Sequence, residues 1–253
     1  MTADCTVVVP YFDEAARFDA APVAELLAKA EVDVLAVDDG STDATPALLA
    51  ELATAHDGRV TVLTLDRNRG KAEAVRQGLV AALAAGAGLV AYCDADFAAP
   101  PGEVARLVDA LRADVALDAV IASRVAMMGT DIRRSAFRHY SGRLFATLGS
   151  LTLGVAVYDT QCGAKAFRAT PRLAAAVADP FVSGWAFDVE LLGRLLPARC
   201  VEVPLQTWHD PGGSHMTLRA GLRATADLAR IRRDLRRRSA RGVDGGQEQR
   251  HRP

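Results

Sequence analysis

Two aspartates separated by one alanine, Asp94 and Asp96, are the residues of this sequence whose types and spacing most directly suggest chemistry. Side chains two positions apart on an extended chain point the same way, so both carboxylates could face one cation. Aspartate oxygens suit Mg²⁺ or Mn²⁺ rather than a soft metal. Taken alone, the pair is more often a helix-capping aspartate beside a solvated one, because short motifs are frequent by chance. Other motifs must therefore decide its role.

The residues around this pair indicate where it lies in the fold. The apolar residues 89–93 predict a strand that is buried on both faces of a sheet. Pro100-Pro101 ends the strand and opens a helix, since proline fits the first helical turn. Carboxylates at the carboxyl end of a buried parallel strand lie at the edge where open α/β sheets bind ligands.

Three other predicted strands also end in polar residues. Apolar and β-branched runs at residues 6–9, 32–37 and 60–65 predict these strands. The segments that close them are Val9-Pro10-Tyr11-Phe12-Asp13-Glu14, Asp38-Asp39-Gly40-Ser41 and Asn68-Arg69-Gly70-Lys71. Helically spaced apolar residues between the strands predict an α/β fold, with a mostly parallel sheet covered by helices on both faces. The polar segments would then meet at one edge of the sheet.

Composition is ordinary, but the charge is unevenly distributed. The chain has 253 residues, half of them apolar and 24% charged, which suits one large globular domain. Its net charge of −1 hides a crowd of arginines at residues 219–238. Such a block indicates an anionic partner, unless it is only a solvated helix face. No nucleic-acid-binding motif accompanies it, so no nucleic-acid partner is expected.

The sequence shows no sign of export or of a membrane-spanning helix. The amino terminus has neither a basic nor an apolar signal region. The longest uncharged runs, residues 77–93 and 144–158, fall short of the roughly 20 apolar residues that a spanning helix needs. Four scattered cysteines suit reduced thiols of a cytosolic protein: Cys5, Cys93, Cys162 and Cys200.

After residue 124 the strand–helix rhythm changes. Apolar residues at positions 137, 140, 144, 148 and 151 predict a helix over 135–153. Core packing is the default explanation of this stripe, and a lipid-facing groove is the alternative. Strands at 164–167 and 201–205 and a helix at 185–196 follow. The end of the chain predicts a basic amphipathic helix over 216–238 and a disordered tail over 239–253.

The four strand-end motifs, in this order and spacing, resemble the nucleotide-binding half of inverting glycosyltransferases with the GT-A fold. More narrowly, they resemble the family that carries a DDGS turn and a DxD motif. The resemblance implies that Asp94 and Asp96 hold Mg²⁺ or Mn²⁺ on the diphosphate of a nucleotide sugar, with Asp96 the closer ligand. It also implies that Asp39 accepts a hydrogen bond from the base or ribose, and that Lys71 faces the diphosphate. The other residues that it assigns to the nucleotide pocket are Pro10, Phe12, Glu14 and Ala95.

Motifs in the second half narrow the resemblance to dolichyl-phosphate glucosyltransferases and their bacterial polyprenyl-phosphate relatives. This resemblance implies transfer of glucose from UDP-glucose to a polyprenyl or dolichyl phosphate, with GDP-mannose as the second choice of donor. A glycan or soluble hydroxyl remains the alternative acceptor. The motifs are Ser123-Arg124, residues 159–167 and 185–192, and Trp208-His209-Asp210 with Gly213-Ser214.

The expected catalytic residues depend on the acceptor. A polyprenyl phosphate is already an oxyanion near neutral pH and needs no general base. Arg124 and Lys165 would then compensate phosphate charge, although either could instead pair with a nearby aspartate. A hydroxyl acceptor must lose a proton, for which Asp188 is the candidate base; otherwise Asp188 is a helix cap.

The resemblance also sets the expected domain boundaries. Residues 1–215 would form one glycosyltransferase domain, in which 1–125 bind the nucleotide sugar and 126–215 the acceptor. Asp13 stands where the lipid-phosphate enzymes usually have Asn, and His215 stands where they commonly have Lys. Many of these enzymes have membrane-spanning helices. Since this chain shows none, we expect the basic helix to dock on the anionic inner face of the cell membrane.

Overall fold

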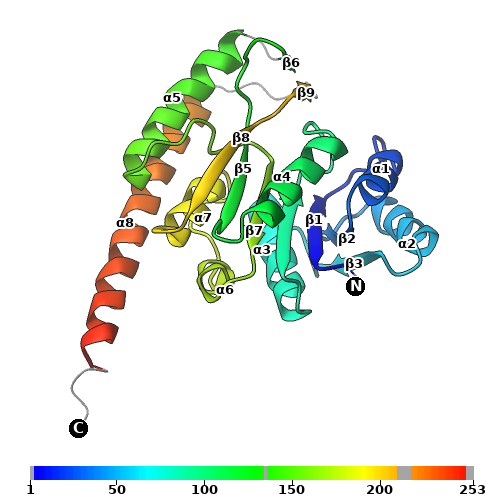
Figure 1. Ribbon diagram of the computed structural model, residues 1–253, viewed down its shortest axis with the longest axis horizontal. Helices are drawn as coiled ribbons and strands as arrows, with labels where there is room; N and C mark the ends of the chain where they lie inside the picture. The colour runs from blue at the N-terminus through cyan, green and yellow to red at the C-terminus, as the bar shows by residue number, and fades with distance from the viewer. Residues whose placement is uncertain (1–2, 134–135, 210–217, 249–253) are drawn as a thin grey trace.

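The computed structural model describes residues 3–133, 136–209 and 218–248 of the chain. Its centre is a seven-stranded sheet, with a two-stranded sheet beside it (Figure 1). Neighbouring strands of the large sheet are parallel, except that β7 runs antiparallel to both β4 and β5. The strands, in spatial order, are β3 (Val60–Thr64), β2 (Val32–Asp38), β1 (Cys5–Tyr11), β4 (Leu89–Cys93), β7 (Ala164–Arg168), β5 (Ala119–Ser123) and β8 (Cys200–Pro204). The sheet is therefore mostly parallel, as the sequence predicts.

Helices cover both faces of this sheet, which confirms the α/β prediction. On one face pack α1 (Ala21–Lys29), α2 (Thr45–Ala55) and α4 (Pro101–Ala113), and on the other pack α3 (Lys71–Ala84), α6 (Pro171–Ala178) and α7 (Phe187–Leu195). Alternate residues of β1 enter the two cores: Val7 joins the first and Val8 the second. Because helices exclude water from both faces, β2 and β4 are buried at every position.

The remaining elements lie beside β8. Strand β6 (Asp131–Arg133) pairs in parallel with β9 (Thr207–His209). Helices α5 (Ala136–Leu153) and α8 (Leu218–Glu248) pack with α7 around a third apolar core, which includes Phe145, Val189 and Ile231. In Figure 1, α8 runs along the side of the molecule opposite to β1, β2 and β3.

Two elements differ from the sequence-based expectation. β6 and β9 were not predicted, because three residues are too few to show a period of two. Helix α8 continues to Glu248, ten residues past the predicted boundary at 238, where the sequence predicts a disordered tail. Once a helix is nucleated, each further residue costs little, and no proline occurs between residues 218 and 252. Residues 249–253 lie outside the described residues.

The apolar stripe of α5 divides between two environments. Leu148 packs against the third core, whereas Tyr140, Leu144 and Leu151 are exposed. The default explanation, that the whole stripe packs in a core, is therefore wrong for these three residues. Within the described residues, no helix combines the length and apolar character needed to cross a bilayer.

Candidate functional site

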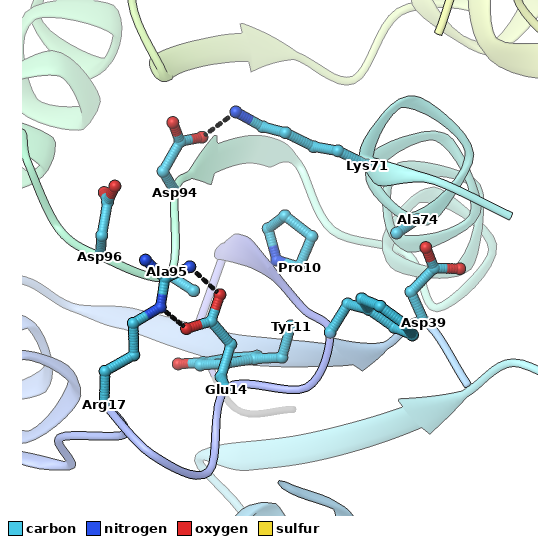
Figure 2. A pocket seen from close by; sticks show the side chains of 11 residues that line it. Pro10, Tyr11, Glu14, Arg17, Asp39, Lys71, Ala74, Asp94, Ala95 and Asp96 are labelled. Carbon is cyan, nitrogen blue, oxygen red and sulfur yellow. Dashed lines mark hydrogen bonds and ion pairs between the residues drawn. The ribbon is translucent and has the colours of Figure 1, made fainter. Parts of the chain in front are cut away.

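The loops that follow β1, β2 and β4 enclose a cavity of about 190 Å³ (Figure 2). Parallel pairing of β1 with both β2 and β4 brings their carboxyl ends to the same edge of the sheet. The eight residues expected in the nucleotide pocket all line this cavity: Pro10, Phe12, Glu14, Asp39, Lys71, Asp94, Ala95 and Asp96. The structure thus brings together residues that are up to 86 positions apart in the sequence.

One wall of the cavity carries the two aspartates that follow β4. The Nζ atom of Lys71, the first residue of α3, lies 2.6 Å from Oδ1 of Asp94. Asp96 is exposed, and its Oδ1 accepts a hydrogen bond from the Ala98 amide at 3.0 Å. Burial raises the pKa of Asp94, and Lys71 opposes that shift. Burial by itself would lower the pKa of Lys71, but the attraction of Asp94, Asp188 and Asp96 together outweighs burial and the pKa is raised.

Gly163 forms the back of this wall. The Asp94 amide donates to the carbonyl of Gly163 at 3.1 Å. A Cβ atom on Gly163 would lie 2.2 Å from Oδ2 of Asp94, closer than any real contact. The carboxylate therefore rests directly against the backbone that leads into β7.

Asp39 holds the opposite wall in place. Its carboxylate accepts hydrogen bonds from the amides of Arg69 (2.8 Å) and Gly70 (2.7 Å). Burial raises the pKa of Asp39, against the effect of these two bonds. The next residue, Gly40, has φ +69°, and a Cβ there would lie 2.4 Å from the backbone of Arg67. Only glycine fits such a close approach at positive φ, so the turn after β2 is locked to the segment before α3.

The loop after β1 is tied to the same turn. The Asp13 carboxylate accepts from the Thr42 amide at 2.8 Å, and the Glu14 amide donates to Oγ1 of Thr45 at 2.8 Å. Glu14 forms an ion pair with Arg17, which also lines the cavity (Figure 2). Asp13 stands at φ +48°, where Asp and Asn are both tolerated. Asp13 uses only acceptor capacity in its bond to Thr42, which an asparagine oxygen would also provide.

Asp94 and Asp96 fit a hard divalent cation that binds together with phosphate. Within the described residues, no group of three His, Cys, Asp or Glu side chains forms a complete metal site. Two carboxylates facing a cavity are nevertheless enough protein ligands for Mg²⁺, which usually takes its remaining ligands from water and substrate phosphates.

The three expected catalytic residues lie outside the lining of this cavity. Lys165, on β7, is fully buried, and its Nζ bonds to Oδ1 of Asp188 (2.6 Å) and to the carbonyl of Cys162 (2.7 Å). Asp188 also accepts a hydrogen bond from the hydroxyl of Tyr92. Asp188 is not a helix cap, since α7 begins after Ala186 without a side-chain cap. Lys165 and Asp188, which were expected to face a substrate, are therefore already paired with each other in the protein interior.

Arg124 forms an ion pair with a nearby aspartate, Asp159, which was the alternative to contact with phosphate. Its guanidinium forms a bidentate pair with Asp159, with Nε–Oδ2 and Nη2–Oδ1 distances of 2.7 and 2.8 Å. Burial would raise the pKa of Asp159, but Arg124 outweighs it and the pKa is lowered. The carboxylate of Glu202 accepts from the amides of Tyr158 and Asp159 and so fixes this loop. Arg124 and Asp159 line a second, smaller cavity of about 30 Å³ beside α5.

Comparison with known proteins identifies the family. Residues 6–171 match the profile of Glycosyl transferase family 2, which is more than half of the chain. The chain belongs to glycosyl transferase family 2. It is therefore a glycosyltransferase, and its mostly parallel sheet is the GT-A-like sheet that the motifs predicted.

Two relatives and one solved structure illustrate the similarity. The dolichyl-phosphate beta-glucosyltransferase of Saccharomyces cerevisiae is 31% identical over 252 residues, covering 90% of this chain and 73% of the relative. The polyprenol monophosphomannose synthase of Mycolicibacterium smegmatis is 32% identical over 178 residues, covering 69% of this chain and 66% of the relative. The crystal structure of glucosyl-3-phosphoglycerate synthase from Mycobacterium tuberculosis with Mn²⁺, UDP and phosphoglyceric acid superposes with a TM-score of 0.65 at 20% identity. It covers 91% of this chain and 79% of that one, and at this identity the likeness concerns the fold.

Sequence reasoning missed several residues of the site. Tyr11, Arg17 and Ala74 line the cavity, and Tyr92 binds Asp188 behind it. Arg17 lies three residues after Glu14, a spacing that is common for surface pairs and carries little information. Tyr92 did leave a signal, because a hydroxyl within a buried strand needs a hydrogen-bond partner.

Proposed function

We propose that the protein transfers a hexose, with inversion, from a nucleotide sugar to a polyprenyl or dolichyl phosphate. The observation that carries this proposal is the cavity that joins the aspartates after β4 to Lys71 and Asp39. UDP-glucose is the favoured donor, because the relative that aligns with 90% of the chain is named a dolichyl-phosphate beta-glucosyltransferase. GDP-mannose is the alternative, because another relative is named a polyprenol monophosphomannose synthase.

The donor would lie across the carboxyl ends of β1, β2 and β4. Asp39 would bind the base or ribose with the acceptor capacity that its two backbone bonds leave free. Pro10, Phe12 and Glu14 would line the nucleoside part, and Ala95 the diphosphate part. Asp96 and Asp94 would hold Mg²⁺ or Mn²⁺, which supplies charge neutralisation for the leaving diphosphate.

On the acceptor side the buried ion pairs suit a phosphate nucleophile. Asp188 is a poor general base here, because Lys165 and Tyr92 bind its Oδ1 and only 8% of its side chain is exposed to an acceptor. A phosphate acceptor needs no base, and catalysis then depends on position and charge. The Lys165 ammonium is fully buried and therefore cannot contact the acceptor. We assign it the role of holding the Asp188 carboxylate in position. Arg124, which is partly exposed beside the second cavity, is our candidate for contact with acceptor phosphate.

The proposal includes docking on an anionic membrane at the cytoplasmic face. Support comes from two surfaces. Tyr140, Leu144 and Leu151 form an exposed apolar stripe on α5. Four exposed arginines of α8 face away from its buried side: Arg232, Arg233, Arg236 and Arg237. Exposed apolar and basic residues are the combination that interfacial helices use.

A transfer assay tests the function. Radiolabelled UDP-glucose, and in parallel GDP-mannose, is incubated with Mn²⁺ and protein, with and without polyprenyl phosphate. We expect label in the organic phase only when lipid is present, and near-complete loss in Asp96→Ala. Label that stays in aqueous product would contradict the lipid acceptor and favour a hydroxyl acceptor. Full activity of Asp96→Ala would contradict the metal assignment.

A further inference from the structure

The Asp94 carboxylate is already paired with a positively charged side chain, that of Lys71. The ammonium of Lys71 lies 2.6 Å from its Oδ1, in the cavity where the proposed metal would bind (Figure 2). A metal ion that used this oxygen would have to displace or sit beside a positive charge. The Lys71 ammonium would therefore compete with a divalent cation for the Asp94 carboxylate.

The balance of charge in the cavity indicates when the Lys71 ammonium would leave Asp94. Lys71, Asp94 and Asp96 together carry one net negative charge near neutral pH. A divalent cation alone would make this group positive, with two cations side by side. A diphosphate alone would place at least two more negative charges beside the carboxylates. Only the two ligands together leave the local charge nearly unchanged.

The structure allows the ammonium to move while its backbone stays fixed. The Lys71 side chain is 45% exposed, whereas that of Asp94 is 29% exposed. The preceding residues, Arg69 and Gly70, are held by the Asp39 carboxylate. Lys165, by contrast, is fully buried and cannot move in this way. It continues to compensate the charge of Asp188 when the Lys71 ammonium leaves Asp94.

We infer that Lys71 is an exchangeable counter-ion that restrains metal binding at Asp94 until a nucleoside diphosphate offers its ammonium another anion. This inference rests on the proposed nucleotide and metal site. On arrival of the diphosphate, the Lys71 ammonium moves from the carboxylate to a phosphate oxygen, and Asp94 becomes available to the metal. Metal and nucleotide consequently strengthen each other's binding by the same factor, as linkage requires.

The test measures Mn²⁺ binding directly, without turnover. Free Mn²⁺ is followed by its electron paramagnetic resonance signal during titration of the full chain, with and without UDP or GDP. For Lys71→Met we expect affinity for Mn²⁺ alone to rise about tenfold, and the coupling to nucleotide to fall by about the same factor. Lys71→Arg keeps the charge and should retain most of the coupling.

Arg69→Met is the matched control. It also removes one positive charge from this segment, but the Arg69 guanidinium pairs with Asp66 at 2.8 Å rather than with Asp94. Its Mn²⁺ affinity should stay at the wild-type value. Affinity of Lys71→Met for Mn²⁺ alone that is no higher than that of wild type overturns the inference. Failure of wild type to bind either nucleotide with Mn²⁺ is a separate result, which overturns the proposed function itself.

Discussion

Among single residues, Asp159 shows how the second cavity, beside α5, depends on one carboxylate. It accepts from the guanidinium of Arg124, from the Arg124 amide and from the Gln161 amide. Only 10% of its side chain and 23% of that of Arg124 are exposed. An arginine that loses its carboxylate at this depth keeps most of its desolvation cost. The ion pair is thus needed for stability as well as for the placement of Arg124.

We predict that Asp159→Asn lowers the free energy of unfolding by about 3 kcal/mol at neutral pH, as for other buried pairs broken on one side. The pKa of Asp159 is lower in the folded than in the unfolded protein, because of Arg124. Its contribution is therefore fully present above the unfolded value of about 3.9 and is lost as the pH falls through the folded value. Urea unfolding between pH 3 and 7 should show the difference between wild type and variant shrinking in acid.

Asp131→Asn is the control for this prediction. Asp131 also pairs with an arginine, Arg133, and its pKa is lowered to about 2 by Arg133 and His209. Both partners are exposed, and such pairs contribute little because water screens them. Equal losses of stability in the two variants would show that burial of the Arg124–Asp159 pair has no special effect.

At the scale of secondary structure, the antiparallel strand β7 determines the shape of the cavity wall that carries Asp94. It inserts between β4 and β5 and brings Gly163 behind Asp94. We predict that Gly163→Ala pushes the Asp94 carboxylate aside, because its oxygen is 2.2 Å from the added Cβ position and a side chain shifts more easily than backbone. A displacement of about 1 Å at a reacting centre can cost about 10²-fold in rate, so we expect that loss in transfer activity.

Two measurements separate this effect from unfolding. The melting temperature of Gly163→Ala should stay close to that of wild type, while its affinity for UDP with Mn²⁺ falls. Gly142→Ala, on α5, adds the same methyl group where nothing lies within 4 Å of the new Cβ. It should leave the nucleotide affinity unchanged and should not lower the melting temperature, because alanine is favoured over glycine within a helix. Wild-type nucleotide affinity in Gly163→Ala would show that the position of Asp94 is not limiting.

The contrast between β4 and β7 shows what the sequence could predict. Each motif of the cavity follows its own strand, so parallel alternation of strands and helices was enough to bring the motifs together. Lys165, Asp188 and Arg124 were selected as charges, but their partners depend on tertiary packing. Lys165 and Asp188 meet where β7 and α7 pack against β4, and Arg124 meets Asp159 in the loop before β7. The contact of Asp188 with Tyr92 joins residues 96 positions apart, and such contacts have no local pattern. The sequence could therefore identify these residues but not their contacts.

For the whole molecule, the important asymmetry of charge lies between the cavity at the carboxyl ends of β1, β2 and β4 and helix α8. The cavity is rich in carboxylates, whereas α8 is rich in arginines on its outer face. Its inner face packs on α5 and α7 through Leu228, Ile231 and Leu235. Arg230 and Arg238 are paired with aspartates of α8, and Arg238 also with Asp179. Within the described part of the chain, Arg232, Arg233, Arg236 and Arg237 form no ion pair and remain available to an external anion.

This arrangement predicts salt-sensitive binding to anionic lipid. Basic residues near an anionic membrane contribute about 1 kcal/mol each, so Arg233→Gln with Arg237→Gln should weaken binding to phosphatidylglycerol vesicles by about 2 kcal/mol, roughly 30-fold. Co-sedimentation with vesicles at low and high salt measures the effect, since screening weakens attraction between exposed charges. Arg67→Gln with Arg133→Gln removes the same charge from exposed positions outside α8 and should have little effect. Equal losses in both double variants would indicate attraction by net charge rather than docking through α8, and binding by wild type that ignores salt would contradict an electrostatic contact altogether.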